Sequence, residues 1–200
     1  MNADSPTSPS DAKRALRSEL IAARARIPHE ARAEKSRAIA DRIEAVAPFR
    51  EARVIALYAP LGTEVDGVEI ARRALRRGAR VVFPRAVAGE RRLAFAPCAP
   101  GELVRGPLGA GEPPAGCEEV APDEIGCVVL PGVGFSLDGF RLGRGGGYYD
   151  ATLRAMPGAA RLGVAYDVQV LPALPREPHD APLDALVTES RTLFFGRDSR

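Results

Sequence analysis

Short apolar runs alternate in this chain with segments whose hydrophobic residues recur at helical spacing. An apolar run over residues 53–58 leads to Pro60, a helical segment follows over 68–77, and another apolar run covers 80–83. This order is typical of a β-α-β unit, in which a helix connects two parallel strands. The pattern therefore predicts an α/β fold with a mainly parallel central sheet flanked by helices.

The remaining segments extend this prediction to an open, Rossmann-like α/β sandwich. Helices are predicted over 11–27, 29–46 and 148–155, with prolines closing the first two. Further strands are predicted over 93–96, 125–130, 161–166, 184–188 and 192–195. Most of the Pro- and Gly-rich stretch 84–122 is expected to be loop. Such a sheet binds its ligand at the carboxyl ends of its strands.

Length and composition favour a single domain. The chain has 200 residues, of which 46% are hydrophobic, enough for one sizeable core. Residues 1–9 are polar and Pro-rich, so we expect a disordered tail followed by one domain over 10–197. The sequence has neither a spanning apolar stretch nor the apolar centre of a signal peptide, which predicts a cytoplasmic protein without a membrane partner.

Charge and cysteine content exclude several classes of function. The 28 basic and 26 acidic residues nearly cancel, so no strong field favours nucleic acid, and a small-molecule ligand is expected. The three cysteines are odd in number and form no C-x-x-C pair, which disfavours a disulfide framework and a cysteine zinc site. We expect a monomer.

The segment Arg141-Leu-Gly-Arg-Gly-Gly-Gly-Tyr-Tyr-Asp150 is the strongest candidate for chemistry. Consecutive glycines let backbone N–H groups form a concave anion nest, and two arginines add guanidinium forks suited to phosphate. The helix that follows points its positive end at the same place. The spacing matches neither G-x-x-x-x-G-K-[ST] nor G-x-G-x-x-G. Three glycines alone would favour a flexible surface turn, but the two arginines, two tyrosines and aspartate within ten residues favour phosphate binding.

Asp150 has two interpretations at the start of the predicted helix. A carboxylate there stabilises the helix dipole. It can also recruit Mg²⁺ beside nucleotide phosphates, which needs only one or two carboxylates, and Asp180 or Asp184 would supply a second.

Two further groups are weaker candidates. Lys13 and Arg17 flank the apolar stripe of the first helix, and Glu64 and Asp66 follow a predicted buried strand. The pattern alone favours solvated charges in both places.

With these motifs in order, the sequence resembles 5-formyltetrahydrofolate cyclo-ligases from Lys13 to about Glu189. The resemblance rests on Lys13-Arg-Ala-Leu-Arg17, Tyr58-Ala-Pro-Leu-Gly-Thr-Glu-Val-Asp66, Leu130-Pro-Gly-Val-Gly-Phe135, the block 139–150, and Leu174-Pro-Arg-Glu-Pro-His-Asp180. The G-R-G-G-G-Y-Y-D segment is the most specific of them. Some relatives carry lysine where this chain has Gly146.

The resemblance implies roles for particular residues. Lys13 and Arg144 would act in catalysis, and Asp150 and Asp180 would hold Mg²⁺. The folate would contact Pro60, Glu64, Asp66 and Tyr148, with either acid making the key contact. ATP would contact Lys13, Arg14, Ala15, Leu16, Arg17, Arg141, Leu142, Gly143, Arg144, Gly145, Gly146, Gly147, Tyr148 and Tyr149.

The implied reaction converts 5-formyltetrahydrofolate and ATP to 5,10-methenyltetrahydrofolate, ADP and phosphate, through phosphorylation of the formyl oxygen. Two alternatives stay open from the residues themselves: an ATP-dependent ligase or kinase for another small molecule, and a noncatalytic nucleotide- or RNA-binding homologue. The near-neutral charge and the set of candidate phosphate and metal residues favour an enzyme.

Overall fold

A seven-stranded sheet organises the chain in the computed structural model, which describes residues 9–177 and 180–196. Its strand order is β12-β11-β9-β6-β1-β2-β3, and the five inner strands pair in parallel. The two edge strands pair antiparallel. The predicted mainly parallel sheet is confirmed, with these bounds: β1 (Val54–Ala56), β2 (Arg80–Ala86), β3 (Leu93–Pro97), β6 (Cys127–Leu130), β9 (Ala160–Val164), β11 (Ala185–Val187) and β12 (Thr192–Phe194).

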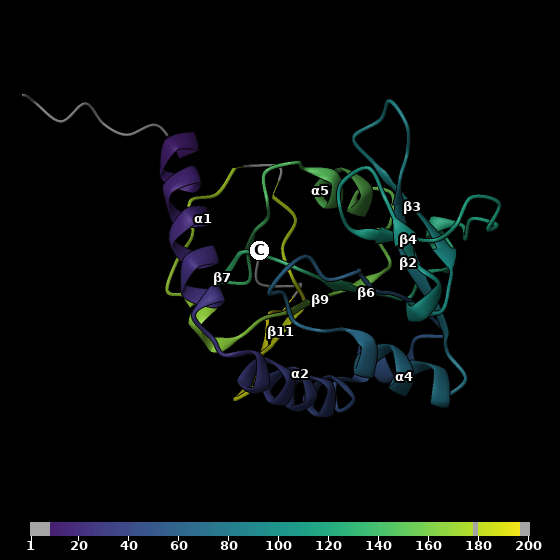
Figure 1. The fold of residues 1–200 in the computed structure, drawn as a ribbon, viewed down its shortest axis with the longest axis horizontal. Coiled ribbons are helices and arrows are strands. Elements are labelled where there is room, and N and C mark those ends of the chain that lie inside the picture. Colours follow the sequence, from purple (N-terminus) through teal and green to yellow (C-terminus); the bar gives the residue numbers. More distant parts are fainter. Residues whose placement is uncertain (1–8, 178–179, 197–200) are drawn as a thin grey trace, which may run out of the picture.

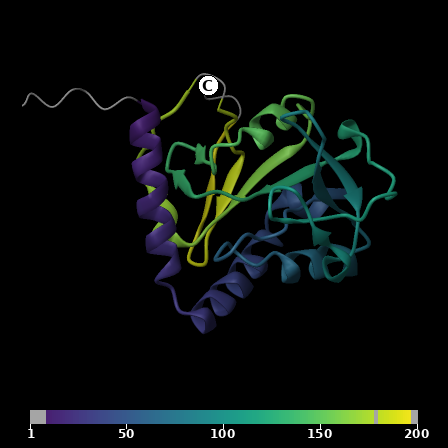
Figure 2. The same ribbon diagram turned by 45° about the horizontal axis from the view of Figure 1, so that its top comes forward.

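Helices cover both faces of this sheet (Figure 1). One face carries α2 (His29–Ile43), α3 (Ala47–Glu51) and α4 (Val68–Arg76), and the other carries the short α5 (Tyr148–Leu153). Helix α1 (Pro9–Ala25) stands along one end of the sheet, as Figure 2 shows from a second direction. The arrangement is the predicted α/β sandwich with an additional helix at its end.

Burial on both faces explains why the central strands read as continuous apolar runs. In β6, Cys127 and Val129 face the core beneath α2 and α4, whereas Val128 and Leu130 face the core beneath α5. A parallel strand between two helical layers has no solvent-facing side, so every position favours an apolar residue.

The predicted second helix is shorter than expected because Pro48 opens a helix instead of closing one. Helix α2 ends at Ile43, and Pro48 occupies the first turn of α3, where a missing N–H costs no hydrogen bond. Helix α1 begins at Pro9, two residues before the predicted start. Of the predicted tail, residues 1–8 lie outside the described residues, as does residue 197 at the end of the predicted domain.

The stretch 84–122 contains more regular structure than predicted. Strand β2 continues through Pro84 to Ala86, because β1 pairs with β2 only up to Val82 and needs no donor from Pro84. The stretch also holds β3, a small hairpin and a 3₁₀ turn, with another such turn at its end: β4 (Val104–Arg105), β5 (Gly111–Glu112), η1 (Pro100–Glu102) and η2 (Pro122–Glu124).

A second, three-stranded sheet in the order β10-β7-β8 was not predicted. It consists of β7 (Gly134–Ser136), β8 (Arg141–Leu142) and β10 (Val170–Leu171), which follows η3 (Asp167–Gln169). The Asp138-Gly139 pair, with Gly139 at φ 84°, forms the turn between β7 and β8. This turn chemistry was a readable hairpin signal.

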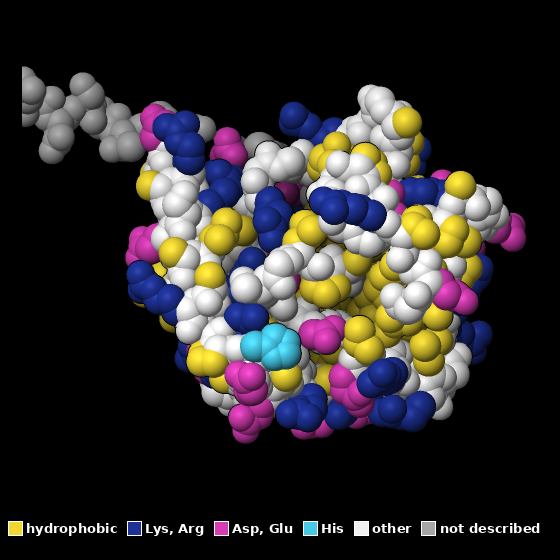
Figure 3. All heavy atoms as spheres, in the orientation of Figure 1, with side chains coloured by type: hydrophobic (Ala, Val, Ile, Leu, Met, Phe, Trp, Pro, Cys, Tyr) yellow, Lys and Arg dark blue, Asp and Glu magenta, His cyan; other side chains and the backbone are white. Residues whose placement is uncertain are grey.

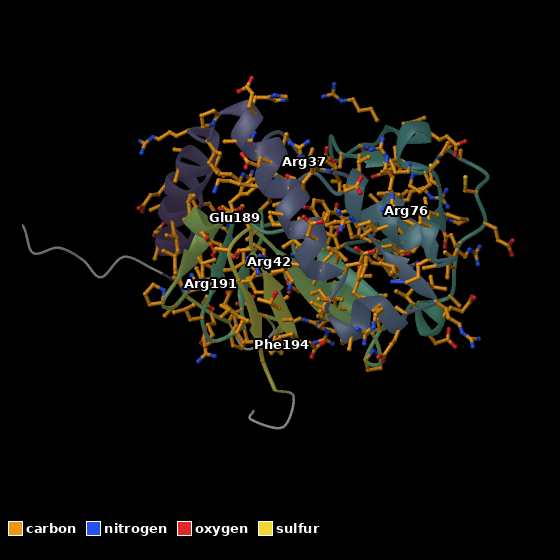
Figure 4. All side chains as sticks on the ribbon, turned by 90° about the horizontal axis from the view of Figure 1, so that it is seen from below. Arg37, Arg42, Arg76, Glu189, Arg191 and Phe194 are labelled. Atoms are coloured by element: carbon orange, nitrogen blue, oxygen red, sulfur yellow. The ribbon has the colours of Figure 1, made fainter. Side chains whose placement is uncertain are left out.

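Glu189, which follows β11, connects α2 to the sheet through an ion pair and hydrogen bonds. Its carboxylate pairs with Lys35 and accepts the backbone N–H of Asp167 at 2.9 Å, and its carbonyl accepts Arg42 Nε at 3.0 Å. Figure 4 shows Arg42 and Glu189 on neighbouring elements of this face. Side chains distant in sequence thereby hold the helical layer in place.

The order of the strands reverses at β1. The chain moves from β1 to β2 on one side and later places β6, β9 and β11 on the other. The connections that leave the carboxyl ends of the neighbouring strands β1 and β6 therefore run in opposite directions, and open α/β sheets bind ligands at such a point. Among the described residues, no helix has the length and apolar character needed to cross a membrane.

Candidate active site

A cavity of about 350 Å³ opens at this reversal point, at the carboxyl ends of β1 and β6. The volume is within the range of small-molecule sites. Figure 3 shows the hollow in this face of the molecule, with hydrophobic side chains in its depth and Lys and Arg side chains at its rim. Its walls come from α1, the loops after β1 and β6, the β4–β5 hairpin, and the glycine loop, residues 143–147.

The glycine loop connects β8 to α5 and forms one wall. Gly145 and Gly147 have φ of 102° and 69°, a left-handed region that glycine adopts without the clash of a side chain. Within the described ranges, the backbone N–H groups of Gly145 and Gly146 donate to no protein acceptor, and both residues are exposed. The loop therefore offers backbone donors to an anion, as a nest does.

Arg141 lies buried at the base of this loop. Its Nη2 donates to Asp150 Oδ1 at 3.0 Å, its Nη1 donates to the carbonyl of Ala181 at 3.3 Å, and its guanidinium stacks on the Tyr149 ring at 6.0 Å. Because β8 carries Arg141 and α5 carries Asp150, this ion pair closes the glycine loop at both ends. Such anchoring holds the backbone donors in one geometry.

Two cations of α1 reach the opposite wall. Lys13 Nζ lies 2.7 Å from Glu177 Oε2 and 3.2 Å from Asp180 Oδ2, and Arg17 Nε donates to the carbonyl of Gly143 at 2.9 Å. Burial lowers the pKa of Lys13, but the hydrogen bonds that its ammonium group donates to the two carboxylates outweigh this effect, so the pKa is raised. The lysine remains charged at neutral pH.

Of the two acids predicted after β1, Glu64 lines the cavity and Asp66 does not. Its Oε1 accepts two hydrogen bonds from Arg144, and its Oε2 accepts the backbone N–H of Leu61 at 2.9 Å. The buried Arg24 lies behind it, with Nη1 3.9 Å from Oε1. Glu64 thus sits between two guanidinium groups, one from the glycine loop and one from α1.

Tyrosines and apolar side chains surround Glu64. Burial raises the pKa of Tyr58 and of Tyr149, and the negative charge of Glu64 raises both further. Both phenols are therefore neutral at neutral pH. The cavity is otherwise lined by apolar residues that suit a flat ring: Pro84, Leu93, Leu108 and Pro131.

The structure brings most of the predicted site residues to this one cavity. It is lined by Lys13, Arg17, Glu64, Arg141, Leu142, Gly143, Arg144, Gly145, Gly146, Gly147, Tyr148, Tyr149, Asp150 and Asp180. Five others are not among its lining residues: Arg14, Ala15, Leu16, Pro60 and Asp66. Arg14 pairs with Asp11 on the exposed side of α1, and Asp66 accepts the N–H of Val68 at the start of α4.

Sequence analysis missed three charged residues here. Arg24 had a readable signal, because it occupies the apolar stripe of α1 between Leu20 and Ile27. Glu177 gave no signal beyond its place near Asp180. Glu112 is a buried lining residue whose Oε1 accepts the N–H of Ala86, and it lies in a stretch predicted to be mostly loop.

The donor set fits a Mg²⁺ ion shared with a phosphate ligand. Asp150 and Asp180 both line the cavity, and each has one carboxylate oxygen without a hydrogen bond or ion pair among the described residues. The described residues form no cluster of three or more His, Cys, Asp and Glu side chains. Two carboxylates with phosphate and water ligands are a common way to hold Mg²⁺.

A family model and curated relatives match most of the length of this chain. A model described as the 5-formyltetrahydrofolate cyclo-ligase family matches residues 9–189. A 5-formyltetrahydrofolate cyclo-ligase of Escherichia coli is 32% identical over 81% of this chain and 92% of its own length. One of Mycolicibacterium smegmatis is 29% identical over 90% and 94%, respectively.

Solved structures agree with this relationship. The NMR structure of Aquifex aeolicus 5,10-methenyltetrahydrofolate synthetase superposes with a TM-score of 0.80 at 32% identity, covering 94% of both chains. A 5,10-methenyltetrahydrofolate synthetase from Mycoplasma pneumoniae gives a TM-score of 0.73 at 26% identity, covering 88% of this chain and 98% of its own. The similarity extends over nearly the whole fold.

Proposed function

The chain belongs to the 5-formyltetrahydrofolate cyclo-ligase family, and on this premise we propose that it closes 5-formyltetrahydrofolate to 5,10-methenyltetrahydrofolate with ATP and Mg²⁺. Members of this family are ligases that act on small molecules. One observation carries the proposal: the glycine loop and Glu64 line the same cavity, so an anion site adjoins an acceptor site. ATP would occupy the first and the folate the second.

The anion site suits the phosphates of ATP. The N–H groups of Gly145 and Gly146 donate to no acceptor in the part of the chain that the structure describes, and Lys13, Arg17 and Arg144 line the same cavity with positive charge. Fixed donors of this kind stabilise charge on the transferring phosphoryl group without reorganising during the reaction. Lys13 and Arg144 are the residues we assign to catalysis.

The acceptor site suits a pterin ring. The carboxylate of Glu64 can accept N–H groups from the ring, and Tyr58, Tyr149 and the apolar lining surround it. Tyr148 is half-buried beside the glycine loop, where its ring can contact the folate and the nucleotide. Asp66 does not line the cavity, and its Oδ1 instead accepts the N–H of Val68 at the start of α4.

The proposed reaction needs no covalent protein nucleophile. The formyl oxygen attacks the γ-phosphorus, the bond from that phosphorus to the bridging oxygen breaks, and ADP leaves. The N10 nitrogen then attacks the formyl carbon, the carbon–oxygen bond breaks with release of phosphate, and N10 loses its proton. Positioning of the two substrates and stabilisation of charge supply the acceleration.

Asp150 and Asp180 are the proposed Mg²⁺ ligands. When bound there, Mg²⁺ would neutralise charge on the phosphate oxygens of ATP. Arg141 and the N–H of Ala181 fix Asp150, while Lys13 and the N–H of Glu177 fix Asp180. These contacts orient the carboxylates before a ligand enters.

Formation of the methenyl product tests this function directly. The protein is mixed with 5-formyltetrahydrofolate, Mg²⁺ and ATP, and absorbance in the methenyl-folate band is followed, with an ATP-free control. We expect an ATP-dependent rise together with equimolar ADP. A protein that binds ATP but forms no product would refute the proposal.

We also propose that the enzyme works as a monomer in the cytoplasm, without a nucleic-acid or membrane partner. The near-neutral charge supports the absence of a nucleic-acid partner, because it creates no strong positive field. Light scattering on the purified protein and fractionation of cells test it, and a stable dimer or a membrane-bound pool would contradict it.

A further inference from the structure

Arg24 is a charged residue in the interior that the proposed reaction does not explain. Its side chain is 2% exposed, and it lies on the core-facing stripe of α1. A guanidinium withdrawn from water is costly unless it is hydrogen-bonded and paired. Its partners all lie on the two loops that end β1 and β6: Thr63 Oγ1 at 3.0 Å, Glu64 Oε1 at 3.9 Å and the Gly132 carbonyl at 3.4 Å.

The two arginines beside Glu64 differ in their freedom to move. The side chain of Arg144 is 45% exposed and extends from the glycine loop, whereas Arg24 is enclosed and bonded on several sides. Glu64 itself is only 6% exposed. Arg144 can therefore exchange its partner for a phosphate, but Arg24 cannot leave Glu64 without unpacking α1.

We propose that Arg24 is a positioning residue for Glu64, holding the carboxylate in place and keeping a positive charge beside it when Arg144 turns to a phosphate group. The proposal rests on the function proposed above, in which the same glycine loop binds ATP. It assigns different roles to the two arginines: Arg144 is an exchangeable partner of Glu64 and Arg24 is a permanent one.

Other groups near Glu64 cannot replace that charge. Tyr58 from the end of β1 and Tyr149 from α5 face it, and the Tyr166 hydroxyl donates to its carbonyl at 3.5 Å. These phenols are neutral at neutral pH, because burial raises their pKa. Burial lowers the pKa of Arg24, yet an arginine stays protonated in proteins. Without Arg24, the buried carboxylate of Glu64 would have no cation beside it once Arg144 has left, and an unpaired buried charge is costly.

The first test removes the charge and keeps a polar side chain. In Arg24→Gln, we expect kcat/KM for 5-formyltetrahydrofolate to fall about tenfold or more, as for a buried charged group that loses its partner, with KM for ATP within about twofold. The loss should fall on the folate and not on ATP, because Glu64 lies on the folate side of the cavity. A kcat/KM for 5-formyltetrahydrofolate within about twofold of the wild type, or an equal loss for both substrates, would overturn the proposal.

Two further variants separate charge from packing. Arg24→Lys keeps a cation and should return kcat/KM for 5-formyltetrahydrofolate toward the wild-type value. Thr63→Val removes a hydrogen-bond acceptor of Arg24 and no charge, so it should lower the melting temperature and leave kcat/KM for the folate within about twofold. If Thr63→Val lowers kcat/KM as far as Arg24→Gln does, Arg24 acts through packing alone and the proposal is wrong.

A double-mutant cycle tests, without measuring turnover, whether Arg24 acts through Glu64. Binding of 5-formyltetrahydrofolate is measured by calorimetry for Arg24→Gln, Glu64→Gln and the double variant. The double variant leaves neither charge unpaired, so it should fold even if Arg24→Gln does not. We expect it to bind like Glu64→Gln; a further loss beyond about threefold would refute a role through Glu64. Turnover of the wild-type protein with ATP tests the proposed function separately. A failure of the Arg24 proposal can therefore be distinguished from a failure of the proposed function.

Discussion

Arg144 donates two hydrogen bonds to the same oxygen of Glu64, from Nε at 3.0 Å and from Nη2 at 2.9 Å. The pair joins the glycine loop to the loop after β1, across the mouth of the cavity. In the proposed reaction, one partner binds phosphate and the other binds folate. Each substrate therefore competes with a contact inside the protein, and the pair must open before both are bound.

Removal of the Arg144 side chain should affect turnover far more than stability. We expect Arg144→Ala to lower kcat by about 10²–10³-fold, as for loss of one fixed donor to a transition state. Its half-exposed ion pair contributes at most about 1 kcal/mol to folding. Turnover and melting temperature are measured together, with the exposed Arg53→Ala as control. A drop in activity that follows unfolding would make the loop structural.

Asp150→Asn should weaken the use of Mg²⁺ and leave the fold intact. The amide oxygen can still accept from Arg141 and Ala181, but it carries no charge for a cation. We expect the Mg²⁺ concentration for half-maximal rate to rise about tenfold or more. Asp123→Asn, in the exposed η2 turn, is the matched control. A wild-type Mg²⁺ dependence would remove Asp150 from the metal site.

Gly147→Ala should strain the glycine loop. The position has φ 69°, where an L side chain costs about 1–2 kcal/mol, although the new methyl group has room. We expect a higher KM for ATP along with the loss of stability, because the backbone donors shift. Gly89→Ala places the same strain, at φ 75°, in the β2–β3 hairpin and should lower stability alone. Equal effects of both variants on ATP binding would contradict this assignment.

The pairing of Lys13 predicts a distinct alkaline transition. Its pKa is raised above the ordinary 10.5, so its stabilising contribution is complete below that value and is lost as pH rises through the folded-state pKa. We expect Lys13→Met to be less stable than the wild type by about 1.5–3 kcal/mol at neutral pH, the range for hydrogen bonds to charged groups. Denaturant unfolding at several pH values measures the difference, which should shrink only above 10.5. A difference that shrinks at lower pH would contradict a raised pKa.

Local sequence determined the sheet and the glycine loop. The run that becomes β6 is apolar at every position because both faces of that strand are buried, and this is visible without a structure. Gly145 and Gly147 adopt positive φ for a reason contained in their own lack of a side chain. Turn chemistry at Asp138-Gly139 was equally local, and it was overlooked.

The tertiary structure decided which charges meet. Lys13 pairs with Glu177, 164 positions along the chain, and Arg24 reaches Glu64 from a helix that stands at the end of the sheet. Sequence spacing could not separate Glu64 from Asp66, because their difference is orientation: one enters the cavity and the other caps α4. Hydrophobic periodicity and the φ/ψ preferences of single residues act over a few residues, so they can be predicted from the sequence. Ion pairing depends on distances of a few ångströms between remote segments, which only the packed fold sets.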